Sequence, residues 1–268
     1  MKKIIALLMA VLMTMAVLAG CGTKDSGTNS EQTDMEYVKD KGTLIVGITV
    51  FEPMDYQDEN GNWIGFDADM AKAFAKHLGV EAQFQVIADW DAKTMELDSK
   101  NVDVVWNGMT LTDDVLAMME CSNAYCNNEQ VVVVKKEVAE QYQTVDSVKG
   151  LNFAVENGSA GQKALDAIGG IKYTPVQDQA GALMEVKSGT SDAAVIDSLM
   201  AGAMIGEGTD YADLTYTVAL SSEEYGVGFR KGSDLAAELN QFFKDSYADG
   251  SMLELAKTYG VQEALIEQ

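Results

Sequence analysis

The chain has 268 residues, and its 42 Asp and Glu outnumber 19 Lys and Arg, which gives a formal net charge of -23. This charge argues against a nucleic-acid-binding protein, because a phosphate backbone would repel it. Hydrophobic residues make up 47% of the chain, too many for a disordered protein, and only 2 prolines argue against Pro-rich linkers. The sequence therefore predicts a globular protein with one large domain or two of ordinary size.

Residues 1–20 are predicted to be a signal peptide. Lysines at positions 2 and 3 precede an apolar run that is too short to span a membrane comfortably. The run ends in LAGC, which is similar to the lipobox, where a signal peptidase cuts before a cysteine that receives a diacylglyceryl group. We therefore expect Cys21 to be lipidated and to anchor the protein on the extracytoplasmic face of the cell membrane. An ordinary signal peptide with an incidental cysteine is the alternative.

Residues 21–36 are predicted to form a flexible, lipid-anchored tether. From Gly22 to Asp34 the segment GTKDSGTNSEQTD has no large apolar residue and is rich in Ser, Thr, Gly and charge. Such a segment cannot bury enough apolar surface to fold by itself.

Two further cysteines, Cys121 and Cys126, leave two interpretations open. In an exported protein, a pair five residues apart can form a disulfide. Two small buried thiols are the alternative, since free cysteine packs well in a core. With one His and two spare Cys, the sequence predicts no zinc site and no other cofactor.

From residue 42 onward, short apolar runs alternate with helical patterns. The first series has predicted strands at 43–48, 82–87, 102–106 and 130–134. Between them, apolar residues recur with helical spacing from Phe66 to His77, and Gly79 is expected to end this helix as a C-cap. Thr112, followed by two aspartates, is expected to begin another helix.

A second series has predicted strands at 152–155, 171–176 and 192–196, with helices from 160, at 180–187 and at 198–205. Two such series predict an α/β protein of two lobes with mostly parallel sheets. After a strand at 225–230, the helices predicted at 234–247 and 252–259 have no strands of their own. These helices must therefore pack on an existing lobe.

Several runs of the sequence resemble the polar amino acid solute-binding proteins of ABC importers, bacterial extracellular solute-binding protein family 3. They are GTLIVG from Gly42, Pro53, GNWIGFDADM from Gly61, GMTLT from Gly108, and the segments 183–197 and 225–232. The most specific run is GFDADMAKAFAKHLG, and the resemblance covers residues 37–260.

The resemblance implies a type II periplasmic-binding-protein fold, in which two α/β lobes are joined by two crossover strands and a ligand binds in the cleft. Lobe one would contain residues 37–126 and 231–268, lobe two residues 131–221, and the hinge residues 127–130 and 222–230. The implied function is to capture an amino acid and deliver it to the permease of an ABC importer, with the binding protein acting as a monomer. Binding of a carboxylate-free amine, or a role as a ligand sensor, is the alternative.

Enzymes also occur on this fold, but the sequence predicts a non-enzyme. His77, the only histidine, falls on an amphipathic helix where a surface position is expected. No Ser/His or Cys/His set for nucleophilic catalysis is present in the sequence.

Candidate ligand-binding residues follow the predicted strands, because loops and helix N-termini converge at strand carboxyl ends in α/β lobes. Phe51 follows the first strand and Trp90 the second, and the resemblance implies that their rings stack on the ligand. A cation between them would gain roughly 0.5 to 2 kcal/mol from the ring faces. Either ring could instead belong to the core.

The third strand is followed by Asn107, Gly108 and Thr110, and the resemblance implies that a backbone carbonyl and a hydroxyl here bind the ligand's ammonium. A turn or N-cap role is the alternative for Thr110. Trp106 and Tyr125 are further candidates, with a core position as the alternative for Trp106.

Asp197 ends the strand DAAVID and matches the family's aspartate that pairs with the ligand's ammonium. A buried aspartate without an adjacent basic residue also favours a cationic partner on physical grounds. Ser159 and Ala160 match a loop whose N–H groups hold a carboxylate at a helix start. A plain N-cap is the alternative for Ser159.

Two positions depart from the family's pattern. Val115 stands where the family has an arginine that binds the ligand's carboxylate, and Arg230, the only arginine of the chain, falls in the predicted hinge. Backbone N–H groups near Ala160 or a lysine must therefore replace it, or the ligand has no carboxylate. Ile48 stands where many relatives have a polar residue, which argues against Lys-, Arg- or Gln-like ligand side chains.

Overall fold

A nine-stranded mixed sheet runs through residues 32–268, the part of the chain that the structure, a computed structural model, describes. The predicted signal peptide, Cys21 and most of the predicted tether lie outside the described residues. Within residues 32–268, no helix is both long enough and apolar enough to cross a membrane.

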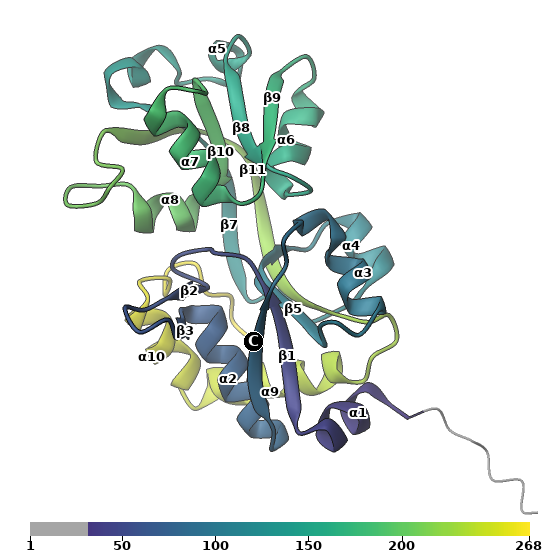
Figure 1. Ribbon diagram of the computed structural model, residues 1–268. Helices are drawn as coiled ribbons and strands as arrows, with labels where there is room; N and C mark the ends of the chain where they lie inside the picture. Colours follow the sequence, from purple (N-terminus) through teal and green to yellow (C-terminus); the bar gives the residue numbers. More distant parts are fainter. Residues whose placement is uncertain (1–31) are drawn as a thin grey trace, which may run out of the picture. The chain divides into compact units, whose positions relative to one another are not determined.

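The helices and strands in chain order, labelled where there is room in Figure 1, are α1 (Asp34–Lys41), β1 (Thr43–Ile48), β2 (Tyr56–Gln57), β3 (Trp63–Ile64), α2 (Phe66–Leu78), β4 (Glu81–Val86), η1 (Trp90–Ala92), α3 (Lys93–Asp98), β5 (Val104–Thr110), α4 (Asp113–Met118), β6 (Glu120–Cys121), β7 (Cys126–Lys135), η2 (Lys136–Gln141), α5 (Val145–Val148), β8 (Asn152–Glu156), α6 (Ala160–Ile168), β9 (Lys172–Val176), α7 (Gln179–Ser188), β10 (Ala193–Asp197), α8 (Ser198–Met204), β11 (Leu214–Phe229), α9 (Leu235–Ala248) and α10 (Ser251–Thr258).

The strand order β4-β1-β5-β11-β7-β10-β8-β9 places two groups of parallel strands on either side of two long strands. In lobe one, β1 pairs in parallel with β4 and β5; in lobe two, β8 pairs in parallel with β9 and β10. The long strands β7 and β11 pair antiparallel with each other and with β10 and β5, respectively, and Figure 1 shows them passing between the lobes. The predicted α/β class is confirmed, but the expectation of mostly parallel sheets is wrong where these crossover strands add antiparallel pairing.

Both crossover strands are longer than predicted. The sequence predicts strands at 130–134 and 225–230, whereas β7 spans Cys126–Lys135 and β11 spans Leu214–Phe229. Polar residues such as Asn128 and Glu223 interrupt the apolar pattern, but these two lie opposite each other in the β7–β11 ladder. The pairing of the two strands therefore extends both of them through the segments predicted as the hinge.

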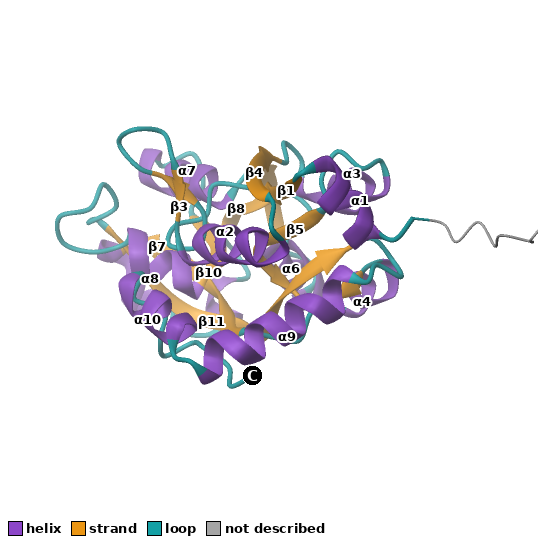
Figure 2. Ribbon diagram, turned by 90° about the horizontal axis from the view of Figure 1, so that it is seen from below, coloured by secondary structure: helices purple, strands orange, loops and turns teal. Residues whose placement is uncertain are grey.

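Helix α2 begins and ends as predicted, with Gly79 in a left-handed C-cap (φ 81°) that donates to the last carbonyls. The two C-terminal helices contact α2 and each other, and Figure 2 shows the three side by side, so they pack on an existing part of the fold, as predicted. Helix α1 begins at Asp34 because Thr33 and Glu36 form a capping box. Residues 34–36 therefore belong to a helix, and the predicted tether ends earlier than expected.

Cys121 and Cys126 are free thiols in the structure, so they form no disulfide there. Of the two, Cys126 is buried, as the second interpretation expects, whereas Cys121 is only half-buried. Burial raises the pKa of Cys121 to about 11 and the pKa of Cys126 well above its ordinary value. His77 is on the surface, as predicted, where its Nε2 lies 2.8 Å from Glu238 Oε1.

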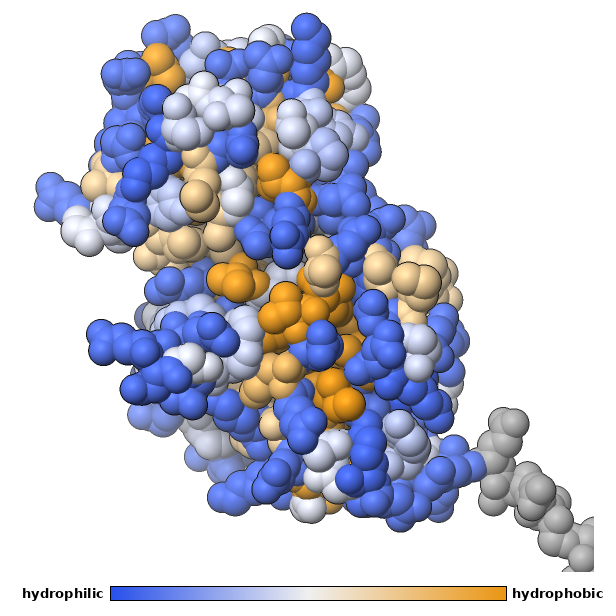
Figure 3. Space-filling view, viewed as in Figure 1, coloured by the Kyte–Doolittle hydropathy of each residue, from blue (hydrophilic) through white to orange (hydrophobic). Residues whose placement is uncertain are grey.

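The surface of the described residues is mostly hydrophilic on the face that Figure 3 shows, in keeping with the acidic composition. Hydrophobic side chains gather in this view over β1 and the edge strand β4, whose Val86 is 41% exposed.

Candidate functional site

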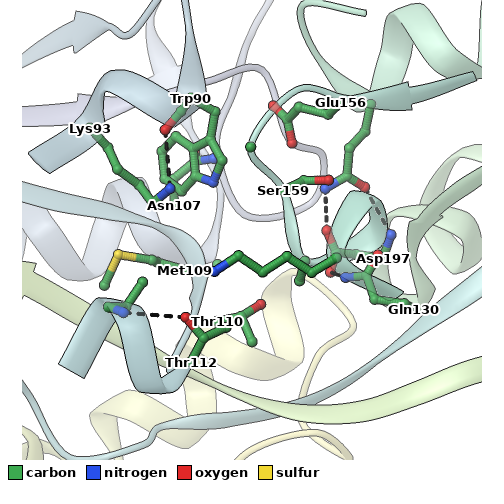
Figure 4. A pocket seen from close by; sticks show the side chains of 16 residues that line it. Trp90, Lys93, Asn107, Met109, Thr110, Thr112, Gln130, Glu156, Ser159 and Asp197 are labelled. Atoms are coloured by element: carbon green, nitrogen blue, oxygen red, sulfur yellow. Dashed lines mark hydrogen bonds between the residues drawn. The ribbon is translucent and has the colours of Figure 1, made fainter. Parts of the chain in front are cut away.

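A pocket lies between the lobes, where loops and helix starts that follow β4, β5, β8 and β10 meet. Its empty space, including the part open to solvent, is ≈ 450 Å³. Seven of the predicted ligand-binding residues line the pocket: Trp90, Asn107, Gly108, Thr110, Ser159, Ala160 and Asp197. Figure 4 shows the labelled lining side chains converging from both lobes.

Asp197, the last residue of β10, is 4% exposed. Side-chain amides of Asn128, Gln130 and Gln179 donate to its carboxylate, with a Gln130 Nε2 to Oδ1 distance of 2.6 Å. Burial, and then the nearby Glu223 carboxylate, raise the pKa of Asp197 well above its usual value. No ion pair of the described residues includes Asp197, so a ligand cation would stabilise its charged form.

Glu156 is a second buried acid in the pocket, and the sequence analysis missed it. It is the last residue of β8 and is 3% exposed. Its Oε1 is buried without a hydrogen-bond partner in the structure. Burial, followed by the charges of Asp197 and Asp178, raises the pKa of Glu156 to about 8.

Two lysines line the pocket and were also missed. Lys93 begins α3 and is 8% exposed; its Nζ donates to the Trp90 carbonyl at 3.1 Å and lies 5.0 Å from the centre of the Trp90 ring. Burial lowers the pKa of Lys93. Lys163 on α6 forms an ion pair with Asp114 on α4, with 2.8 Å between Nζ and Oδ2. Lys93 is therefore the lining lysine without a carboxylate partner among the described ion pairs.

The start of α6 faces the pocket through Ser159 and Ala160. Ser159 is the N-cap, and its hydroxyl accepts from Gln162 N at 3.2 Å, so the side chain has the N-cap role named as its alternative. Ala160 is the first residue of the helix, and the N–H groups of a first turn have no acceptor within their helix. These N–H groups can receive an anion.

Phe51 does not line the pocket, so the expectation of two rings facing each other across the ligand is corrected. Phe51 is 2% exposed and packs edge-on against Tyr225, with 6.2 Å between ring centres. Gly108 lies over it: a Cβ on this glycine would be 2.3 Å from Phe51 Cε1. Phe51 therefore packs against Gly108 outside the pocket lining, while the Trp90 side chain lines the pocket.

Asn107 lines the pocket, but its side chain is already occupied. Its amide donates to Thr49 Oγ1 at 2.8 Å and accepts from Thr49 N at 2.9 Å, which ties β5 to the end of β1. Trp106 and Tyr125 are both 0% exposed and lie in the core, which was the alternative for Trp106.

The departures from the family pattern have different consequences. Val115 lines the pocket, whereas the Arg230 guanidinium pairs with Asp34 at 2.9 Å and cannot replace the missing arginine there. Ile48 is 0% exposed in the core and is not part of the lining. Ile48 therefore does not exclude polar ligand side chains, contrary to the expectation from the sequence.

Comparison with known proteins decides the family. The family model of bacterial extracellular solute-binding proteins, family 3, matches residues 44–262. This chain belongs to that family. It is 30% identical over 251 residues to the L-cystine-binding protein TcyJ of Escherichia coli K12, with 92% of each chain covered. It is 31% identical over 265 residues to the arginine-binding extracellular protein ArtP of Bacillus subtilis, covering 97% of this chain and 98% of ArtP.

A solved structure of the family has the same fold. A mutant of the arginine-binding protein ArgBP from T. maritima superimposes with a TM-score of 0.78 at 32% identity, covering 84% of this chain and 98% of that one. The two lobes with antiparallel crossover strands are thus those of a type II periplasmic-binding protein, as predicted.

One of the residues missed in this family 3 protein, Glu156, shares a sequence signal with a predicted residue. Glu156 ends β8 as Asp197 ends β10, so the rule that strand carboxyl ends meet in the cleft applies to both. Lys93 has no such signal, because its position in the pocket depends on the packing of α3.

Proposed function

We propose that this protein is an extracytoplasmic solute-binding lipoprotein that captures an amino acid between its lobes and passes it to an ABC importer. The observation that carries the proposal is Asp197, a buried carboxylate that the described residues provide with amide donors but no cation. The family and the relatives that bind cystine or arginine support an amino acid as the ligand. Asp197 would bind the α-ammonium, and the pocket would bind its ligand without chemical conversion.

The ligand's carboxylate would bind at the start of α6 and at Lys93. The first-turn N–H groups near Ala160 are oriented for an anion, and Lys93 is buried in the same pocket. Together they would take the role of the carboxylate-binding arginine that the family has at the position of Val115. A carboxylate-free amine is the second candidate, because N–H groups and a lysine bind a carboxylate less strongly than a bidentate guanidinium does.

Native mass spectrometry of the purified protein, read for co-purified small molecules and followed by calorimetric titration, tests the proposal. We expect an α-amino acid to bind more tightly than the amine obtained by removing its carboxylate. The reverse order would favour the amine, and binding of neither would overturn the proposed function.

We further propose the lobe boundaries given above and closure of the lobes about β7 and β11. Two contacts support closure beside the pocket: Asn157 Nδ2 donates to Asp89 Oδ1 at 3.0 Å, and Lys163 pairs with Asp114. Small-angle scattering should show a smaller radius of gyration with saturating ligand, because ligand contacts with both lobes stabilise the closed form. An unchanged radius on confirmed binding would contradict hinge closure.

The lipid anchor at Cys21 lies outside the described residues and stays a prediction. We expect the mature protein to begin at Cys21 and to partition into detergent, because acyl chains dominate its membrane affinity. Intact mass of the membrane fraction checks this, and a Cys21→Ala variant with unchanged membrane association would contradict it.

A further inference from the structure

We propose that Glu156 binds a second positively charged group of the ligand, so that the pocket selects small molecules with two cationic groups. The inference rests on the proposed function, since it takes the interlobe pocket as the ligand site and Asp197 as the site of the first ammonium.

The first support is the position of Glu156. It lines the pocket at the end of β8, is 3% exposed, and has an Oε1 that is buried without a hydrogen-bond partner. In Figure 4 its carboxyl group points toward the side of the pocket where Trp90 and Lys93 lie, away from Asp197. An unpaired buried oxygen of an acid costs free energy that a donor from a ligand would recover.

The second support is the charge of the pocket. The charged groups that act on Glu156 are Asp197 from β10, Asp178 from the N-cap of α7, and Lys93 from α3. Glu156 and Asp197 have no ion pair among the described residues, and Lys163 is already paired with Asp114. Two buried acids thus face one buried lysine. When both acids are charged, a ligand with no net charge leaves excess negative charge in the pocket, whereas a ligand with one additional cation cancels it.

The third support is that the two acids are held differently. Asp197 accepts from three side-chain amides, which fixes its carboxylate. Gln179 lies between the acids: its Nε2 donates to Asp197, and its side chain also favours the charged form of Glu156. The Gln179 side chain therefore lies between the two carboxyl groups, so each acid can accept a cation of its own.

Binding at Glu156 should release a proton. In the empty pocket, burial raises the pKa of Glu156 to about 8, so the carboxyl is mostly protonated at pH 7. A ligand cation beside it favours the carboxylate and lowers its pKa. Cationic ligands should therefore displace a proton at pH 7, and a glutamine at this position cannot release one.

Calorimetric titration of the full mature chain tests the inference with L-lysine, L-arginine, 1,4-diaminobutane and neutral L-glutamine as probes. At least one two-cation probe should bind to the wild type at least tenfold more tightly than L-glutamine does. Titrations in buffers of different ionisation enthalpy should show that this binding releases a proton. Glu156→Gln should remove this preference and the proton release, so that the two-cation probes bind no more tightly than L-glutamine. Glu137→Gln, an exposed change in η2, is the matched control and should alter neither.

The outcomes separate this inference from the proposed function. If L-glutamine binds and Glu156→Gln leaves the preference among probes unchanged, the second cation site is refuted while the proposed function stands. Equal loss of all probes in Glu156→Gln, with an unchanged thermal unfolding curve, would make Glu156 a general support of the pocket and refute the inference. If no probe binds the wild type, both proposals fail.

Thermal unfolding of the empty proteins gives a second measurement. A carboxyl whose pKa is raised on folding stabilises the fold below its ordinary pKa, and this contribution is lost as pH rises through the folded value of about 8. Glu156→Gln should therefore unfold at a higher temperature than the wild type above pH 8, and the difference should shrink toward pH 5. A lower unfolding temperature for the variant at every pH would contradict the inference.

Discussion

Asp197→Asn is expected to weaken ligand binding by roughly 2 kcal/mol or more, about thirtyfold in the dissociation constant. The wild-type carboxylate is buried, accepts from side-chain amides and has no ion pair among residues 32–268, so its charge is available for a ligand ammonium. Asparagine keeps the size of the side chain and removes that charge. Titration with the ligand found by mass spectrometry measures the effect.

The control for this variant is Asp146→Asn, an exposed change at the start of α5 that removes the same charge far from the pocket lining. Thermal unfolding of both variants separates a loss of binding from a loss of folding. If Asp197→Asn binds the ligand as tightly as the wild type, the ammonium site lies elsewhere and this description of the pocket fails.

Gly65→Ala is expected to lower the free energy of unfolding by roughly 3 to 5 kcal/mol, or to prevent folding. Gly65 precedes α2 with φ 123° and ψ 169°, a backbone conformation that residues other than glycine rarely adopt. A Cβ there would lie 2.1 Å from the Met54 carbonyl oxygen and 2.8 Å from that of Pro53. Both neighbours are backbone atoms, so the clash cannot be relieved by a side-chain rotation.

Gly61→Ala is the matched control, because Gly61 also has a positive φ (80°) but a Cβ there would meet no atom within 4 Å. The control should cost about 1 kcal/mol, the penalty of the left-handed conformation alone. Chemical denaturation measures both variants. Similar losses for the two would show that the clash at Gly65 is relieved by movement of the 53–54 segment.

The Gly65 variant should also affect the pocket, through Asp67. Asp67 lies in the first turn of α2, and its Oδ2 accepts from the Gly108 N–H at 2.7 Å, which holds a lining residue in place. A shift at the start of α2 would therefore move Gly108. A Gly65→Ala protein that folds should bind its ligand less tightly than the Gly61→Ala protein.

Local patterns in the sequence were sufficient for much of the fold. Helix α2 was predicted to within its last residue because apolar spacing and a C-cap glycine act over short distances. The strand DAAVID was predicted because a continuous apolar run marks a buried strand, and its final aspartate then had to lie at the cleft edge. The N-caps at Thr112 and Ser159 likewise depend only on the residues that follow them.

Only the tertiary structure decided the rest. Strand β11 extends through polar residues because β7 pairs with it, and that partner is distant in the sequence. Phe51 is buried under Gly108 because a glycine from another strand leaves room for its ring. Lys93 and Glu156 lie in one pocket because the lobes that carry α3 and β8 meet there. When a distant segment buries a charged side chain, no local sequence pattern indicates that burial.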